Sequence, residues 1–537
     1  MISSTFLITT LPLLAAAQLD GLLPFGNSDE EFNPFPYQPG FDIEAVAKTA
    51  KILPTHSWEY GSACEALLEL HNPEYSVFGE NAFPSIVLDS KNVDALAYAK
   101  EKIVLGEVPN AFSDGDGAVG DPAALGVYAM LLGKAGDIPM STKADEEVAY
   151  LTGAAPRWPN GAISHRANVA ELCFLYMAPP FLAYYAADKK NETLLRESVD
   201  QCSFYREVLQ SNDTNTAGIW AHIIGPESAD LGLWSTGNGW AAAGCSRVLA
   251  TVLNSPFGQS VAWKDEAAST LTTVIKEIVD GARAMPEDDG LLRNYLNDTT
   301  TPHGFGEISG SSLLAAVVYR MAVLQPQTFG ADYISWAEGV RTTLGGNDAA
   351  GQPHITTNGT VTPAVNPLGW TDEKPFTAGS PEGNNFVVLL YAAWRDCIDA
   401  GICQKPDPSA PATSAAASSS VPLSTSVPLS SSAAVSASVP ASGSASAPAS
   451  ASSPASASAP ASASAPAVSS APAESSAPAA SSAPAASSVP AVTSGAAGSS
   501  APAVPVDTAA PLDPAAPADP AALPGARRFH RRRAQIA

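Results

Sequence analysis

Four short segments of this sequence mix aromatic residues, glycines and single polar head groups, a combination suited to binding sugars. They span residues 58–61, 218–222, 234–240 and 307–311 and read WEYG, GIWAH, WSTGNGW and EISGS. Aromatic rings stack on the C–H faces of sugars, glycines let the backbone approach closely, and amide, imidazole and carboxylate groups bond the hydroxyls. A single tryptophan in a helical protein more often belongs to the core. The recurrence of the pattern nevertheless predicts a saccharide site.

The candidate saccharide-binding side chains are aromatic or polar. Six of them lie in these segments, and two more lie at positions 121 and 165. The candidates are Trp58, Tyr60, Asp121, His165, His222, Trp234, Asn238 and Trp240. Two of them have a simpler interpretation. Asp121 precedes Pro122 and could cap a helix, and His165 could be a loop histidine with its own hydrogen-bond partners. Both interpretations stay open on the sequence.

The elements that must position these residues are nearly all helical. Apolar residues recur at helical spacing, and no alternating run is long enough to build a sheet. Helices are predicted over about residues 90–105, 122–132, 166–187, 192–209, 238–253, 263–283, 309–324, 334–343 and 381–399. Paired helices over about 390 residues predict an all-α toroid or solenoid of helical hairpins.

The predicted helix over residues 166–187 is the most informative of these. It carries an apolar stripe and two prolines, Pro179 and Pro180, which are expected to stop or kink it. Glu171 and Cys173 lie two positions apart, which places them on roughly opposite faces of a helix.

Composition divides the chain into four parts. Residues 1–17 resemble a secretory signal peptide, and residues 18–405 have a mixed, globular composition. Residues 406–525 are rich in Ala, Ser and Pro and cannot bury enough apolar area to offset chain entropy, so we expect a disordered, O-glycosylated stalk. Residues 526–537 form a basic tip that could bind acidic wall polymers or remain a solvated end. No segment reaches the length of a transmembrane helix.

Charge and cysteine content exclude several classes of ligand. The formal net charge of −25 disfavours nucleic acid and long polyanions. Six cysteines are too few for a disulfide scaffold, although Cys397 and Cys403 are close enough to clip the end of the folded part. No cysteine or histidine spacing matches a zinc site, so neither a metal nor an organic cofactor is expected. Sequons compatible with secretion occur at Asn191, Asn212, Asn297 and Asn358.

Longer motifs make the sequence similar to a known superfamily. Over about Thr55–Ala400 the chain resembles the six-hairpin glycosidases, and most of all glycoside hydrolase family 105 in its fungal secreted branch. The motifs that carry the resemblance are WEYGSACEALLEL, GDPAALGV, ISHR, YMAPPFLAYY, GIWAH, WSTGNGW, EISGSSLLAA and GSPEGNNFVVLLYAAW. The resemblance implies an (α/α)6 toroid of six helical hairpins and an activity like that of unsaturated rhamnogalacturonyl hydrolases. These enzymes hydrate the double bond of an unsaturated galacturonyl residue through a single aspartic acid, without a cofactor.

The sequence departs from the family pattern at two positions. Cys173 stands where the family has the catalytic aspartic acid, and the segment is about two residues shorter than usual. A thiol is a poor substitute for a carboxylic acid, so Glu171, the nearest acid, becomes the candidate general acid. Its alternative role is that of a partly exposed helix carboxylate. Thr236 replaces an arginine of bacterial members, which puts recognition of an acidic sugar in doubt.

Two functions from different classes therefore remain open. The chain is either a secreted, monomeric glycoside hydrolase acting on short pectin-derived or related saccharides, or a non-catalytic carbohydrate-binding or cell-wall-associated protein that has lost its acid. An error in the gene model near Cys173 would also explain the short segment. In each case the expected partner is an oligosaccharide or a wall polysaccharide, and the expected location is extracellular.

Overall fold

The computed structural model describes residues 32–85, 89–113, 117–167 and 169–406. The predicted signal peptide, the predicted stalk beyond residue 406 and the basic tip lie outside these residues, so the division into four parts stays a prediction.

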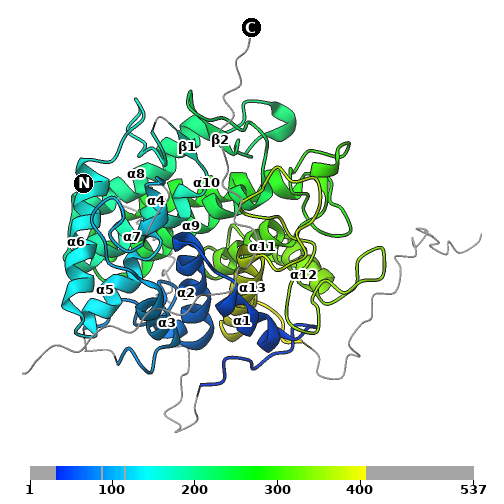
Figure 1. The fold of residues 1–537 in the computed structure, drawn as a ribbon, viewed down its shortest axis with the longest axis horizontal. Coiled ribbons are helices and arrows are strands. Elements are labelled where there is room, and N and C mark those ends of the chain that lie inside the picture. The colour runs from blue at the N-terminus through cyan, green and yellow to red at the C-terminus, as the bar shows by residue number, and fades with distance from the viewer. Residues whose placement is uncertain (1–31, 86–88, 114–116, 168, 407–537) are drawn as a thin grey trace, which may run out of the picture. The chain divides into compact units, whose positions relative to one another are not determined.

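Helices dominate the described residues, and their contacts close into a ring (Figure 1). The inner helices contact one another in the order α2, α4, α7, α9, α11 and α13, and α13 returns to α2. Their bounds are Ser57–His71 for α2, Gly120–Ala123 for α4, Phe174–Lys189 for α7, Ser235–Asn254 for α9, Ile308–Leu324 for α11 and Pro381–Asp399 for α13. Helix α5 (Gly126–Lys134) follows α4 directly and also contacts α7.

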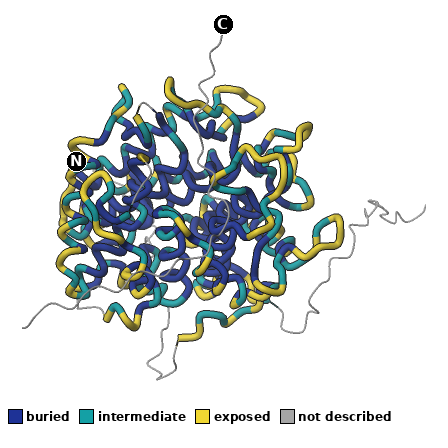
Figure 2. The backbone as a smooth tube through the Cα atoms, in the orientation of Figure 1, coloured by how far each residue is buried: buried dark blue, intermediate teal, exposed yellow. Residues whose placement is uncertain are grey.

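An outer layer of helices covers this ring. Helices α1, α3, α8, α10 and α12 each pack on the inner helices beside them, and α6 packs on α5. Their bounds are Ile43–Ile52, Asp94–Lys102, Ile138–Gly153, Glu192–Leu209, Lys264–Arg283 and Ala331–Leu344. The inner helices are buried over most of their length, whereas outer helices such as α10 bury a single apolar stripe, and Figure 2 shows buried backbone in the middle and exposed loops at the rim. The predicted all-α toroid of six hairpins is confirmed.

Helix α7 is the place where the prediction of a helix over residues 166–187 needs correction. The helix begins at Phe174, after a short strand and a turn at Leu172 and Cys173. The short strand β1 (Ala170–Glu171) pairs antiparallel with β2 (Ile223–Ile224), and the Leu172 amide donates to the His222 carbonyl at 3.2 Å. Pairing with β2 supplies the backbone hydrogen bonds that a helix would otherwise make, so it overrides the apolar periodicity.

The two prolines do not stop this helix, which continues to Lys189. Each proline lacks the N–H that would bond the carbonyl four residues earlier, so the carbonyls of Leu175 and Tyr176 lose their usual partners. Helix α9 packs at this place through Gly244, where a Cβ atom would overlap the Leu175 carbonyl group. A glycine is therefore required for the close approach of α9 to α7.

Replacing Gly244 by alanine is expected to lower the free energy of unfolding by about 1–3 kcal/mol, because the added methyl group forces two buried inner helices apart. Gly339→Ala is the matched control. A Cβ atom at Gly339, within α12, meets no heavy atom within 4 Å. It should raise the free energy of unfolding by about 0.5–1 kcal/mol through helix propensity. Denaturant titration of both variants measures the difference, and equal effects would contradict the packing argument.

Buried ion pairs between side chains stabilise the other end of the ring, where the inner helices end. The Glu69 carboxylate of α2 accepts from Arg247 of α9 and Arg320 of α11, each at 2.7 Å. Its backbone carbonyl accepts from Arg395 of α13 at 2.6 Å. All four side chains are almost fully buried. Glu69 thus ties three inner helices to α2, two through its carboxylate and one through its backbone carbonyl.

The cysteines follow the expected pattern. Cys397 and Cys403 form a disulfide at the end of α13. The remaining thiols, Cys64, Cys173, Cys202 and Cys245, are free and buried. Within the part of the chain that the structure describes, no helix has both the length and the apolar character needed to cross a bilayer.

Candidate active site

A pocket of about 280 Å³ opens at the end of the ring where the inner helices begin. It is lined by His56, Trp58, Asp121, His165, Arg166, Glu171, Cys173, Met177, His222, Trp234, Pro367, Leu368, Trp370 and Glu382. Helices α2, α4, α7, α9 and α13 all place their first turns or the residues just before them here. Helix N-termini carry partial positive charge, which makes this end of the ring suited to anionic groups.

The structure brings most of the predicted site residues together in this pocket. They are Trp58, Asp121, His165, Glu171, His222 and Trp234. They come from segments spread over about a third of the chain, and the start of α7 meets the loop before α9 through the β1–β2 pair.

Three other predicted saccharide-binding residues lie away from the pocket, and their assignment needs correction. Trp240 has no exposed surface because its ring packs between Tyr176 and Phe386. Asn238 is also fully buried, and its amide bonds the backbone of Trp220 and Trp234.

Tyr60 is the third, and it points to a different face of α2. Its ring lies 6.4 Å from that of Tyr98 and close to the ammonium group of Lys102. In the motifs WEYG and WSTGNGW, helical geometry turns one aromatic residue toward the pocket and the other away from it.

His222 is held by a carboxylate, which is itself fixed by a phenol. Its Nδ1 lies 2.9 Å from Oδ2 of Asp230, which also accepts from the Tyr295 hydroxyl at 2.7 Å. Burial would raise the pKa of Asp230, but the hydrogen bonds from His222, Tyr295 and the Gly232 amide outweigh it and hold the pKa at about 2. Because an ionised Asp230 accepts, Nδ1 carries the hydrogen and Nε2 is the acceptor nitrogen.

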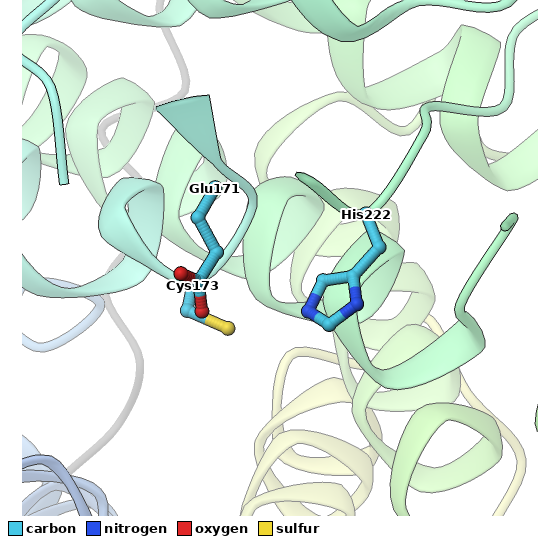
Figure 3. Close-up of side chains that lie close together, drawn as sticks. All are labelled: Glu171, Cys173 and His222. Atoms are coloured by element: carbon cyan, nitrogen blue, oxygen red, sulfur yellow. The ribbon is translucent and has the colours of Figure 1, made fainter. Parts of the chain in front are cut away.

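Glu171 and Cys173 both face the pocket, which corrects the expectation that they occupy opposite faces. Glu171 ends the strand β1, the chain turns at Leu172 and Cys173, and this turn brings both side chains to the pocket wall. Figure 3 shows the Glu171 carboxylate beside the Cys173 sulfur, with a ring nitrogen of His222 turned toward them. Burial raises the pKa of the Cys173 thiol well above its usual range, and the negative charge of Glu171 raises it further.

His165 lies behind Glu171 and is neutral. Its Nε2 is 3.5 Å from Oδ1 of Asp121 and 4.0 Å from Oε2 of Glu171. Burial lowers the pKa of His165 to about 4, and Glu171 only partly opposes this. Asp121 is almost fully buried in the first turn of α4 and lines the pocket. The N-cap of α4 is Val119, so the alternative that Asp121 caps this helix is wrong.

Glu382 is the carboxyl group that sequence reasoning missed. It lies in the first turn of α13 and is only 2 % exposed. Its Oε1 accepts from Trp58 Nε1 at 3.1 Å, while Oε2 has no hydrogen-bond partner among the described residues. Burial raises the pKa of Glu382 well above its usual range, and the nearby carboxylates of Glu59, Glu307 and Asp121 add to the rise.

The position of Glu382 in the first turn of a helix lowers its pKa, but this effect is weaker than that of burial. A carboxylate in a first turn gains about 0.3–1 kcal/mol from the helix dipole. Complete burial beside other acids costs a carboxylate more than this. The balance therefore favours the protonated form of Glu382. A carboxyl at the start of a long apolar helix was the signal in the motif GSPEGNNF that could have marked it.

The positions of Thr236 and Arg166 bear on the doubt about whether the pocket recognises an acidic sugar. Thr236 is fully buried and donates to Glu307 Oε1 at 3.0 Å, so it does not line the pocket. Arg166 does line it, from the turn before β1. The pocket thus has a guanidinium group without the arginine that the family pattern places at position 236.

The ring of hairpins and the acid-rich pocket at its open end define the class of six-hairpin glycosidases, as the motifs predicted. More particularly, the chain belongs to Glycosyl Hydrolase Family 88, whose family model matches residues 87–363. It is therefore a glycoside hydrolase by family, and its substrate is a saccharide.

Solved structures agree on the fold. A possible member of the GH105 family from Salmonella enterica serovar Paratyphi A is 13% identical, with a TM-score of 0.51, and covers 72% of this chain and 100% of its own. A possible GH105 member from Klebsiella pneumoniae is 12% identical, with a TM-score of 0.50, and covers 72% of this chain and 99% of its own. No curated protein matches the sequence significantly.

Proposed function

We propose that this protein removes a terminal 4,5-unsaturated uronic acid residue from short pectin-derived or related oligosaccharides. The observation that carries the proposal is Glu382, a buried carboxyl group with a raised pKa in a pocket with tryptophan rings on its walls. The pocket is near the lower limit of typical ligand pockets, which suits one sugar residue at the end of a short chain.

The chemistry needs one proton and one water. Glu382 donates its proton to C4 of the double bond, and the ring oxygen stabilises the positive charge that develops at C5. The Glu382 carboxylate then takes a proton from the water that adds at C5, which regenerates the acid. The resulting hemiketal opens and releases the rest of the saccharide. Glu171, the acid expected from the sequence, is the second carboxyl that could fill this role, and the variants in the Discussion separate the two.

Arg166 is the proposed partner of the sugar carboxylate. A guanidinium group pairs with a carboxylate through charge-assisted hydrogen bonds, which contribute about 1.5–3 kcal/mol. Arg166→Gln is therefore expected to raise KM for an unsaturated galacturonyl disaccharide by about 10- to 100-fold. Arg157→Gln is the matched control, because Arg157 pairs with Glu197 outside the pocket. A KM that rises equally in both variants would contradict the assignment of Arg166.

Two simultaneous readings test the proposed function. Hydration of an unsaturated galacturonyl disaccharide removes the conjugated double bond, so ultraviolet absorbance should fall with time. Tryptophan fluorescence of the same sample reports binding through Trp58, Trp234 and Trp370. Turnover of the unsaturated disaccharide, and not of its saturated counterpart, is the expected result. Fluorescence quenching without any loss of absorbance would favour the non-catalytic binding protein that Cys173 suggests.

Secretion remains part of the proposal. The signal-like residues 1–17 support it, as does the Cys397–Cys403 disulfide, which is typical of oxidising compartments. The asparagines of all four sequons are exposed, so oligosaccharyl transfer could reach them; they are Asn191, Asn212, Asn297 and Asn358. Attachment to the cell wall through the basic tip and a monomeric state are proposed on the sequence alone.

A further inference from the structure

Three side chains of different chemistry converge on one point of the pocket wall. A carboxylate oxygen of Glu171, the sulfur of Cys173 and a ring nitrogen of His222 all lie within 4.8 Å of one another. Cys173 and His222 are buried, and Glu171 is partly buried. They come from two parts of the chain that the β1–β2 pair holds side by side (Figure 3).

We infer that these three residues bind a divalent transition-metal ion, with zinc as the best match. A thiolate, an imidazole and a carboxylate are the three kinds of ligand that zinc takes in proteins. Catalytic zinc sites use three protein ligands and leave a fourth position to water or substrate. Here the fourth position would face the cavity, because all three ligands line it.

The surroundings of His222 match those of a metal ligand. Asp230 occupies Nδ1 and is itself fixed by the Tyr295 hydroxyl and the Gly232 amide. The remaining nitrogen, Nε2, is then left with its lone pair free for an ion. A carboxylate behind a histidine in this way orients metal-binding imidazoles and increases their basicity.

The acidic character of the pocket gives a second, independent reason. Asp121 brings a second carboxyl group to the cavity beside Glu171. A divalent cation would offset this concentration of negative charge. On binding, it would replace the thiol proton of Cys173, which leaves to solvent as the sulfur–metal bond forms.

A bound cation also bears on substrate recognition. Its open position would offer the carboxylate of an acidic sugar a second positive partner beside Arg166. The inference does not depend on the proposed hydrolysis, because metal binding is measured without any sugar.

Cobalt titration of the metal-stripped full-length protein tests the site directly. A cobalt–thiolate bond gives a charge-transfer band in the near ultraviolet, which reports the Cys173 ligand itself. We expect one Co²⁺ per chain with this band, and its loss when Zn²⁺ is added. The band should persist in Cys64→Ala, whose thiol is buried outside the pocket, and vanish in Cys173→Ala.

A second variant keeps all three ligands and changes only the support of His222. Asp230→Asn should weaken Co²⁺ binding by about 10- to 100-fold while the charge-transfer band remains. Absence of the band in the wild-type protein, or its persistence in Cys173→Ala, would overturn the inference. Unchanged affinity in Asp230→Asn would overturn the assignment of His222 as a ligand. None of these results depends on whether the protein turns over a saccharide.

Discussion

Replacing Glu382 by glutamine is expected to lower kcat on an unsaturated galacturonyl disaccharide by about 10²- to 10⁴-fold, the usual contribution of a general acid. Glutamine keeps the shape of the side chain and can still accept from Trp58 Nε1, so the pocket should retain its form. It cannot give a proton to the double bond. KM should therefore change little, and steady-state kinetics separates the two parameters.

Two further Glu→Gln variants serve as a control and as a test of the competing acid. Glu147→Gln makes the same change at a buried carboxyl of α6 outside the pocket, and it should leave kcat intact. Glu171→Gln tests the acid that the sequence suggested. A kcat that collapses in Glu171→Gln but survives in Glu382→Gln would transfer the role of proton donor to Glu171.

Replacing Glu69 by glutamine is expected to lower the free energy of unfolding by about 3–5 kcal/mol, because it removes the counter-charge that two buried guanidinium groups share. Arg247 and Arg320 both bond the Glu69 carboxylate at 2.7 Å, and both are at least 94 % buried. Arg320 keeps a second partner in Asp396, whereas Arg247 keeps a longer contact to Glu65 at 3.7 Å. The amide of the new glutamine would also direct its N–H donors toward one of the arginines, which has no acceptor to offer them.

The control for this change is an ion pair at the surface. Glu266 bonds Arg196 on the outside of the ring, where solvent screens the charges. Denaturant unfolding of Glu266→Gln should match the wild-type protein. If Glu69→Gln also left the free energy of unfolding unchanged, the end of the ring around Glu69 would not depend on these buried ion pairs.

The fold could be predicted from the sequence because its signals are local and repeated. Apolar spacing located most of the long helices, and motif resemblance supplied the closed ring. The start of α7 could not be predicted, because Ala170 and Glu171 pair with residues more than fifty positions away. The spacing of apolar residues around position 170 carries no information about a strand partner so distant in the sequence.

The site was predictable only in part for a similar reason. Loop segments with an aromatic and a polar residue identified Trp58, His222 and Trp234, which do line the pocket. The same pattern could not separate Trp234 from Trp240, because only the packing of Tyr176 and Phe386 decides which ring is buried. Glu382 was missed because its raised pKa arises from burial beside acids of three other segments, a property of the assembled ring.

The central claim is that Glu382 holds a proton at neutral pH in a pocket that receives an unsaturated sugar. Infrared difference spectroscopy between the wild-type protein and Glu382→Gln tests it most directly, because a protonated carboxyl and a carboxylate absorb in separate regions. We predict a carboxylic acid band at neutral pH that is absent from the variant and shifts when the unsaturated disaccharide binds. A carboxylate band in its place at neutral pH would contradict the account.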